Sequence, residues 1–216
     1  MENESGVWRT VNGRRVFIRD GESATDAIKR SLSETDTGAK KISAKEMTQR
    51  LKAAKQEVLP EKAWRVDDTY TAEDYEHYNC ECIAVGQGSC VAVKHGGEDD
   101  GDIISVCASS KDKGAVNGKQ LMKIAVSHGG TKLDSFEGNH GFYLKCGFEP
   151  VSWCRFDREY APHDWKPGRD KEEPVIFYKY TGRVTAESAK NFMMRVPVSE
   201  DYDTAKAARN ASMKKG

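Results

Sequence analysis

The sequence predicts an α+β fold, with a mixed but mainly antiparallel sheet flanked by helices, and three patterns lead to this prediction. Three short β-type runs lie at 78–85, 89–94 and 103–109, with only turn-forming segments between them. Helical periodicity then replaces the strand pattern at 118–128. Strand-like runs return afterwards at 131–136, 150–156 and 175–180.

The three β-type runs form a predicted meander. The first two, YNCECIAV and SCVAVK, are separated by Gly86-Gln87-Gly88, and a glycine- and acid-rich turn at 95–102 leads to the third, IISVCAS. Such runs joined by short turns pair with their chain neighbours. We therefore expect three antiparallel strands in chain order.

The helix predicted at 118–128 has one apolar face. That face comprises Leu121, Ile124, Ala125 and His128. Gly129-Gly130 supplies a C-terminal stop, where we expect His128 to interact with the helix dipole. A short helical piece is predicted at 139–146, and the polar insert at 157–174 separates the last two strands.

The N-terminal part is expected to form a hairpin and helices. Asn12-Gly13 between two β-rich runs at 7–19 is a strong signal of a two-residue hairpin turn. A helix is predicted at 27–33, and a polar linker at 32–40. A second helix is predicted at 43–58, where Ser43 and Glu46 have the spacing of a capping box and Pro60 should end the helix. Its apolar face comprises Met47, Leu51, Ala54 and Val58.

These patterns divide the chain into three predicted parts. They are an N-terminal hairpin and helical extension at 1–60, a main domain at 61–182 and a helical or flexible tail at 183–216. The tail is helix-prone and then polar, and we expect about its last dozen residues to be loosely held.

The composition bounds the functional classes. Charged residues make up 31% of the chain, and its 34 Lys and Arg equal its 34 Asp and Glu, so no global field favours nucleic acid or an anionic membrane. No stretch approaches the roughly 18 apolar residues that span a bilayer, and the acidic, polar N-terminus is unlike a secretory signal. We therefore expect a cytoplasmic protein without a membrane partner.

Six cysteines raise the question of a metal site. They are Cys80, Cys82, Cys90, Cys107, Cys146 and Cys154. None forms the C-x-x-C pair typical of structural zinc, and a strand would place Cys80 and Cys82 on one face. We expect reduced, mostly buried thiols and assign no metal ligands, with a metal or disulfide role as the alternative.

The segment 109–118, SSKDKGAVNG, joins the third meander strand to the following helix. Backbone N–H groups at such a loop and at a helix N-terminus point outward, and the helix dipole favours negative charge there. Its two glycines and two lysines suit a pyrophosphate. An ordinary surface turn is the alternative.

This region resembles the GNAT (general-control-related N-acetyltransferase) family, whose pyrophosphate loop reads (Gln/Arg)-x-x-Gly-x-(Gly/Ala). Lys113 takes the first position and Gly118 the last, while Val116 replaces the central glycine. Ala108 falls where the family's fourth strand offers its backbone to the pantetheine arm of acetyl-CoA. The resemblance implies cofactor contacts at Ala108, Lys113, Gly114, Ala115, Val116, Asn117 and Gly118.

A second motif, Tyr143-Leu144-Lys145-Cys146-Gly147-Phe148, is similar to the family's Tyr-x-x-x-Gly-Phe signature at the end of its short fourth helix. In such enzymes the tyrosine protonates the departing CoA thiolate, which implies that Tyr143 is the general acid. A packed aromatic residue without catalytic function is the alternative for Tyr143.

The resemblance implies transfer of an acyl group, most simply acetyl, from CoA to an amine by direct attack. Backbone N–H groups at the end of the fourth strand would stabilise the oxyanion. The acceptor and the general base are open, with Glu81, Asp67, Asp68 or an ordered water as candidates for the base.

Residues of the polar insert and one histidine are further candidates. Glu159, Tyr160, His163, Asp164 and Trp165 form either a substrate-contacting loop or a solvated crossover. His140, just ahead of Tyr143, has no assigned role.

A catalytically inactive binding or assembly module is the second functional hypothesis, and Val116 in the loop favours it. The N-terminal segment at 8–18 is similar to short segments of bacteriophage morphogenesis proteins, which implies a phage or prophage origin and a docking element for a protein partner. The alternative is a hairpin that covers the edge of the main sheet.

Overall fold

The computed structural model of the chain describes residues 5–11, 14–24, 26–27 and 38–214. The chain divides into two compact units, Met1–Gly130 and Thr131–Gly216. Each unit has its own antiparallel sheet and helices, so the predicted α+β class is confirmed.

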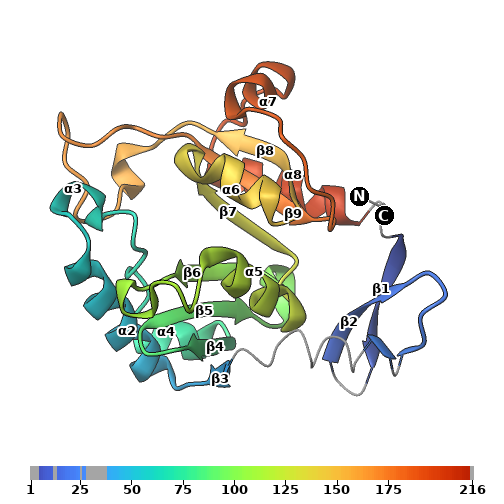
Figure 1. The fold of residues 1–216 in the computed structure, drawn as a ribbon. Helices are drawn as coiled ribbons and strands as arrows, with labels where there is room; N and C mark the ends of the chain where they lie inside the picture. Colours follow the sequence, from blue (N-terminus) through green and yellow to red (C-terminus); the bar gives the residue numbers. More distant parts are fainter. Residues whose placement is uncertain (1–4, 12–13, 25, 28–37, 215–216) are drawn as a thin grey trace. The chain divides into compact units, whose positions relative to one another are not determined.

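The meander lies in the first unit and is confirmed. Its four-stranded sheet has the order β3-β4-β5-β6, with all neighbours antiparallel. The strands are β3 (Lys40–Lys41), β4 (Cys80–Val85), β5 (Ser89–Lys94) and β6 (Ile103–Cys107) (Figure 1). β6 is shorter than the predicted run at 103–109, because the chain leaves the sheet at Ala108 and Ser109 caps a 3-10 turn.

A bulge interrupts the pairing of β5 with β6. Cys90 pairs with Cys107 and Ala92 with Ile104, so Val91 faces two residues of β6. Ser105, one of these two, has a φ of 54°, a left-handed conformation that is rare for serine. Its hydroxyl forms a hydrogen bond of 2.7 Å with the hydroxyl of Tyr75, which holds the bulge in place.

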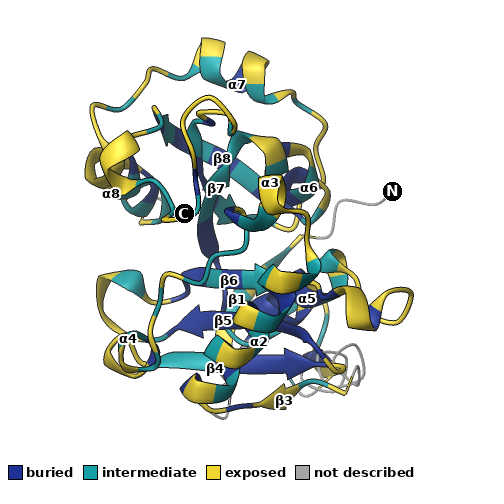
Figure 2. Cartoon of the chain, turned by 90° about the vertical axis from the view of Figure 1, so that its left-hand side faces the viewer, coloured by how far each residue is buried: buried dark blue, intermediate teal, exposed yellow. Residues whose placement is uncertain are grey.

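One face of this sheet is covered by α2 (Ala44–Glu57) and α4 (Ala72–His77). Met47, Leu51 and Ala54 of α2 are buried in the same cluster as alternate strand residues, and the opposite side of α2 is exposed (Figure 2). In the chain, the short α3 (Pro60–Ala63) comes between these two helices. The cluster also contains Cys82, Ala84, Cys90, Ala92, Cys107 and Tyr75.

Three details of α2 differ from the prediction. Ser43 caps the helix, but the Glu46 carboxylate pairs with Arg50 at 3.0 Å instead of closing a capping box. Val58 lies beyond the helix in extended conformation and is exposed. Pro60 does not end α2, but is the first residue of α3, since a proline is well tolerated at that position.

α5 (Gly118–Ser127) packs against β5 and β6. Asn117 and Gln120 form a capping box, and Leu121, Ile124 and Ala125 are buried as predicted. His128 is the C-cap residue and lies 3.4 Å from the Glu81 carboxylate, so the helix-end position predicted for His128 is confirmed.

The second unit contains a three-stranded sheet in the order β7-β9-β8. Its strands are β7 (Lys132–Phe136), β8 (Phe148–Cys154) and β9 (Val175–Tyr180), and its helices are α6 (His140–Lys145), α7 (Ala189–Arg195) and α8 (Tyr202–Met213). β8 begins and ends two residues earlier than the predicted run at 150–156.

The C-terminal tail is more firmly packed than expected. α8 lies against β8 and β9 (Figure 1), and its Ala205 is fully buried beside Phe177. Ser152 donates a hydrogen bond of 2.6 Å to the Ala205 carbonyl. The helix continues to Met213, so most of the segment predicted to be loosely held is ordered by these contacts.

The N-terminal hairpin is present as a separate two-stranded sheet. β1 (Gly6–Val11) pairs with β2 (Arg14–Arg19), and Val11 faces Arg14. This register agrees with a two-residue turn, although Asn12-Gly13 itself lies outside the described residues. Of the predicted helix at 27–33, only Ala27 is described, and it is helical; most of the predicted linker at 32–40 also lies outside the described residues.

Two features of the architecture differ from the sequence-based expectation. The strand pairs of the described residues form three antiparallel sheets rather than one mixed sheet. The division at Gly130 falls inside the segment predicted as the main domain at 61–182, because α2 shares a core with β4 and β5 while α8 shares one with β9. Among the described helices, none is long and apolar enough to cross a membrane.

Candidate functional site

The loop predicted to hold a pyrophosphate follows β6 in the first unit. Ala108 is exposed at the end of the strand. The residues that follow form two parts, 109–112 and 113–119, which differ in burial. We call them the inner loop and the outer loop. Ser109 and Asp112 of the inner loop are buried, whereas most residues of the outer loop are exposed.

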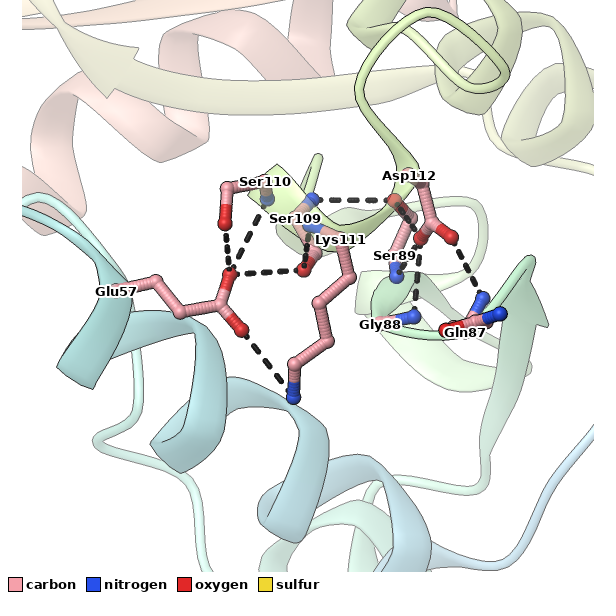
Figure 3. A network of polar contacts seen from close by, with 8 residues as sticks. All are labelled: Glu57, Gln87, Gly88, Ser89, Ser109, Ser110, Lys111 and Asp112. Atoms are coloured by element: carbon pink, nitrogen blue, oxygen red, sulfur yellow. Dashed lines mark hydrogen bonds and ion pairs between the residues drawn. The ribbon is translucent and has the colours of Figure 1, made fainter.

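The carboxylate of Glu57 occupies the donors of the inner loop (Figure 3). Its Oε2 accepts hydrogen bonds from the Ser109 hydroxyl at 3.0 Å, the Ser110 N–H at 3.2 Å and the Ser110 hydroxyl at 2.6 Å. Its Oε1 lies 3.2 Å from the Lys111 ammonium. These groups are the kind that would bind a phosphate, and here a side chain of the same molecule takes them.

The same contacts explain the charge state of Glu57. The hydrogen bond from Ser110 lowers the pKa of this carboxyl, and partial burial opposes that shift. Glu57 is the last residue of α2, where the helix dipole disfavours a negative charge. The donors of the inner loop therefore stabilise an anion that the helix end alone would destabilise.

Asp112 is the second internal anion (Figure 3). Its carboxylate accepts the backbone N–H groups of Gln87, Gly88 and Ser89 at 2.7, 2.9 and 2.7 Å, and the Ser89 hydroxyl at 2.7 Å. Burial raises the pKa of Asp112, but these hydrogen bonds outweigh it and hold the pKa at about 2. Asp112 thus fastens the loop to the turn between β4 and β5.

The glycines of that turn have a packing function which the sequence did not reveal. A Cβ on Gly86 would lie 2.4 Å from Oδ1 of Asp112, and one on Gly88 would lie 2.3 Å from the Ser109 hydroxyl. Both distances are too short for any side chain. The sequence could have indicated this packing only if the contact between Gly88 and Asp112, which lie 24 residues apart, were already known.

The outer loop retains outward donors at the start of α5. The N–H groups of Ala115 and Val116 both donate to the Asp112 carbonyl at 2.9 Å. Among the described residues, none accepts a hydrogen bond from the N–H of Gly118 or Lys119, the first two residues of α5. The exposed side chains of Lys113 and Lys119 add positive charge to this helix end.

The positions predicted to contact a cofactor therefore divide in two. Lys113 has an exposed side chain, Gly118 has an N–H without an acceptor among the described residues, and Gly114 has a φ of 87°. The amides of Ala115 and Val116 are engaged inside the loop, as is that of Asn117, which donates to Gln120 at 2.9 Å. Of the loop amides, those of Gly118 and Lys119 suit an anion best.

A small pocket adjoins the inner loop. It has a volume of about 200 Å³ and is lined by α2, the turn at 87–88 and the inner loop. Arg50 borders it but already pairs with Glu46 and donates to the carbonyls of Gly86 and Ser89. The volume is below the roughly 300 Å³ of ordinary ligand pockets.

Tyr143 lies in α6 of the second unit. Its ring packs against Phe142, Phe148 and Tyr178, and only 7% of the residue is exposed. Burial raises the pKa of its hydroxyl to about 12, although a hydrogen bond with Ser135 opposes the shift. Tyr143 therefore carries its proton at neutral pH, as a general acid must.

His140 connects three parts of the second unit. Its Nε2 lies 3.1 Å from the Glu187 carbonyl, which can only accept, so Nε2 carries the proton. Its Nδ1 lies 3.0 Å from the Tyr178 hydroxyl and accepts from it. Burial lowers the pKa of this imidazole, which favours the neutral form that the two bonds require. His140 is thus a structural residue in this arrangement.

The residues considered as general bases are all engaged. Glu81 contacts His128 at 3.4 Å and His95 at 3.2 Å, and hydrogen bonds from these two histidines, His128 first, lower its pKa well below the usual range. Asp68 pairs with Lys55 at 2.5 Å, and Asp67 accepts from Thr69. For any of these carboxylates to act as the base, it would first have to break its hydrogen bond or ion pair.

The polar insert is anchored in its middle and near its C-terminal end. Trp165 is buried against Phe156 with ring centroids 5.0 Å apart, and Glu173 accepts the N–H of Gly138 at 2.9 Å. Tyr160, at 79% exposed, lies at its surface, and His163 pairs with Asp164 at 3.4 Å.

The cysteines agree with the predicted burial. Cys82, Cys90, Cys107 and Cys154 are buried, and Cys80 and Cys146 are half-buried. Cys80 and Cys82 pack in the same core cluster, so their placement on one face of the strand is confirmed.

The candidate site is thus a loop whose inner donors are taken by carboxylates of the same chain and whose outer part has N–H groups without an acceptor among the described residues. Comparison with protein-family models, with curated proteins and with solved structures finds no match for this chain.

Proposed function

We propose that this chain has a GNAT-like fold and transfers an acyl group from CoA to an amine acceptor. The observation that carries the proposal is the junction of β6 and α5. There an exposed Ala108 follows a bulged strand, and the outer loop presents free amides and lysines.

The order of elements supports the fold. The resemblance is based on a fixed order of features: a meander, a loop, a helix, a strand, a short helix and a strand pair. The chain has the same order, with β4, β5 and β6 followed by the loop, α5, β7, α6, β8 and β9. The short helix α6 ends at Cys146, and Gly147 with a φ of 86° allows the sharp exit into β8.

The bulge supports a ligand at the end of β6. A β-bulge leaves backbone groups outside the ladder and re-aims the strand, and bulges are frequent next to active sites. Ser105 and its bond to Tyr75 hold this bulge only three residues before Ala108. The backbone around Ala108 is thus the natural place for the pantetheine arm and for an oxyanion.

The chemistry needs few protein groups. The pyrophosphate of CoA would be bound by the amides of Gly118 and Lys119 and by Lys113. A neutral amine attacks the thioester carbonyl, and its nitrogen loses a proton to solvent water. The tetrahedral intermediate then collapses as the C–S bond breaks and the CoA thiolate leaves. Tyr143 then gives its proton to the thiolate, and solvent returns a proton to Tyr143.

Calorimetric titration of the full chain with acetyl-CoA tests the proposal first. We expect a dissociation constant in the micromolar range or below and at least about tenfold weaker binding by Lys113→Glu, because a cation next to the pyrophosphate becomes an anion. Lys45→Glu makes the same charge change at an exposed position of α2 and should leave the affinity unchanged. Absence of binding at millimolar acetyl-CoA would contradict the proposal.

The role of Tyr143 requires a separate measurement with an amine panel. Tyr143→Phe should lose about 100-fold or more in turnover while it keeps acetyl-CoA affinity, since only the proton donor is removed. Ser135→Ala removes the hydrogen-bond partner of Tyr143 but not its hydroxyl and should keep most of the turnover. Equal turnover of Tyr143→Phe and the wild type would exclude Tyr143 as the general acid.

A non-catalytic binding or assembly module, of phage or prophage origin, is the second candidate. It is favoured by the internal anions Glu57 and Asp112 and by the burial of Tyr143. On this proposal the N-terminal hairpin would dock a protein partner. No acyl transfer by the wild type to any amine would favour this candidate.

A further inference from the structure

Two cysteines face each other across β5 and β6. Cys90 and Cys107 are directly paired in the antiparallel register, beside the bulge. Both side chains belong to the core cluster under α2, and each thiol is the first cause of the other's pKa shift. In the strand registers of the described residues, no other cysteine has a cysteine as its partner.

This pairing meets the requirements of a disulfide. Directly opposed residues in an antiparallel pair have Cα atoms about 4.5–5.5 Å apart. Disulfides form when the Cα atoms are about 4.4–6.8 Å apart and both side chains lie on the same side. Cys82 shows the contrast, because it lies on the same face but opposes Ala92.

The two thiols also differ in their exposure to solvent. The contact between them raises the pKa of Cys90 and lowers that of Cys107. Cys107 is 8% exposed at the last position of β6, next to the exposed Ala108, whereas Cys90 is fully buried. Local opening of this strand end would expose Cys107 first.

We propose that Cys90 and Cys107 form a reversible disulfide with a small disulfide oxidant such as oxidised glutathione. The Cys107 thiolate attacks one sulfur of the oxidant and releases one glutathione thiolate. The Cys90 thiolate then attacks Cys107 in this mixed disulfide and releases the second. The two protons of the protein thiols go to the two glutathione thiols, so electrons and atoms balance.

The disulfide would restrict the movement of the chain at the start of the loop. It would fasten β6 to β5 at the position just before Ala108 and the inner loop. The inference does not depend on acyl transfer, because it concerns the covalent state of the sheet.

The experiment is oxidation of the folded full chain with excess oxidised glutathione, followed by thiol counting after denaturation. Two of the six thiols should be lost with no retained glutathione mass, and a reductant should restore them. The oxidised protein should also melt about 5 °C or more above the reduced protein, because the bond restricts the unfolded chain.

Peptide mapping identifies the bond. Trypsin places Cys80, Cys82 and Cys90 on one peptide, 66–94, and Cys107 alone on 95–111. Fragmentation of the linked peptide must therefore locate the link at Cys90. Cys82→Ser should form the same link, and Cys90→Ser should leave Cys107 reduced or glutathionylated.

Three results would overturn the proposal. They are a Cys107 peptide that stays reduced in the wild type, a link from Cys107 to Cys80 or Cys82, and a glutathione adduct that never resolves. The wild-type map alone decides among them, even if Cys90→Ser does not fold.

Discussion

At the scale of single residues, the loop after β6 is governed by two carboxylates. Asp112 binds three backbone N–H groups and one hydroxyl, and Glu57 binds two hydroxyls, one N–H and one ammonium. A buried carboxylate is stable only when its oxygens are satisfied in this way. Each residue thus takes donors that an external anion would otherwise use.

Asp112→Asn tests the contribution of the buried carboxylate. We expect a loss of about 1–3 kcal/mol in the free energy of unfolding at neutral pH, because the amide nitrogen cannot accept the N–H groups of the turn. Chemical denaturation measures this loss. Asp100→Asn is the control, since Asp100 is exposed and accepts a single backbone N–H at 3.0 Å.

The same variant has a predicted pH dependence. The pKa of Asp112 is lowered from 3.8 to about 2 in the folded state, so its carboxylate stabilises the fold above pH 3.8 and loses that contribution as the pH falls toward 2. The stability difference between wild type and Asp112→Asn should shrink across this window. A difference that stays constant down to pH 2 would contradict the assignment.

At the scale of secondary-structure elements, the end of α2 holds the inner loop. Glu57 is the last residue of this helix, and its carboxylate accepts hydrogen bonds from both Ser109 and Ser110 (Figure 3). The order of the loop therefore depends on a helix that lies 52 residues earlier in the chain.

Glu57→Ala should loosen the inner loop without unfolding the unit. The N–H of Ser110 loses its acceptor, so its hydrogen exchange should accelerate about tenfold or more, while the amides of β5 should not change. Mass-spectrometric hydrogen exchange measures both. Glu61→Ala, an exposed glutamate in α3, should leave the loop as it is. Unchanged exchange at Ser110 in Glu57→Ala would show that the helix does not order the loop.

At the scale of the whole molecule, the charges balance. Lys and Arg equal Asp and Glu in number, so no long-range field attracts an anion. If the outer loop binds the phosphates of CoA, the attraction is local and comes from Lys113 and Lys119. Such exposed charges are screened within roughly 8–10 Å at physiological salt.

The affinity for acetyl-CoA should therefore depend on salt through these lysines. Raising the salt from 50 to 500 mM should weaken binding by roughly threefold or more in the wild type. The combined variant Lys113→Glu and Lys119→Glu should bind more weakly and lose this salt dependence. Titrations at both salt concentrations test this, with Lys45→Glu as the control that should retain the wild-type response.

Local sequence patterns accounted for much of the fold. The strands at 89–94 and 175–180 have the predicted bounds, and the apolar spacing of Leu121, Ile124 and Ala125 identified the buried face of α5. These features depend on residues close together in the chain. The sequence also located the loop, but it assigned cofactor contacts to Ala115 and Val116, whose amides are engaged inside the loop.

What the sequence by itself determined is the α+β class, most element positions and the loop between β6 and α5. The tertiary structure decided which donors of that loop remain open. Glu57, at the end of α2, accepts hydrogen bonds from the loop, and the Asp112 side chain accepts hydrogen bonds from the turn between β4 and β5. It also decided that Cys90 faces Cys107 and that His140 is held between Tyr178 and Glu187. These contacts join residues far apart in the chain, and only the strand register and the packing of the elements bring them together.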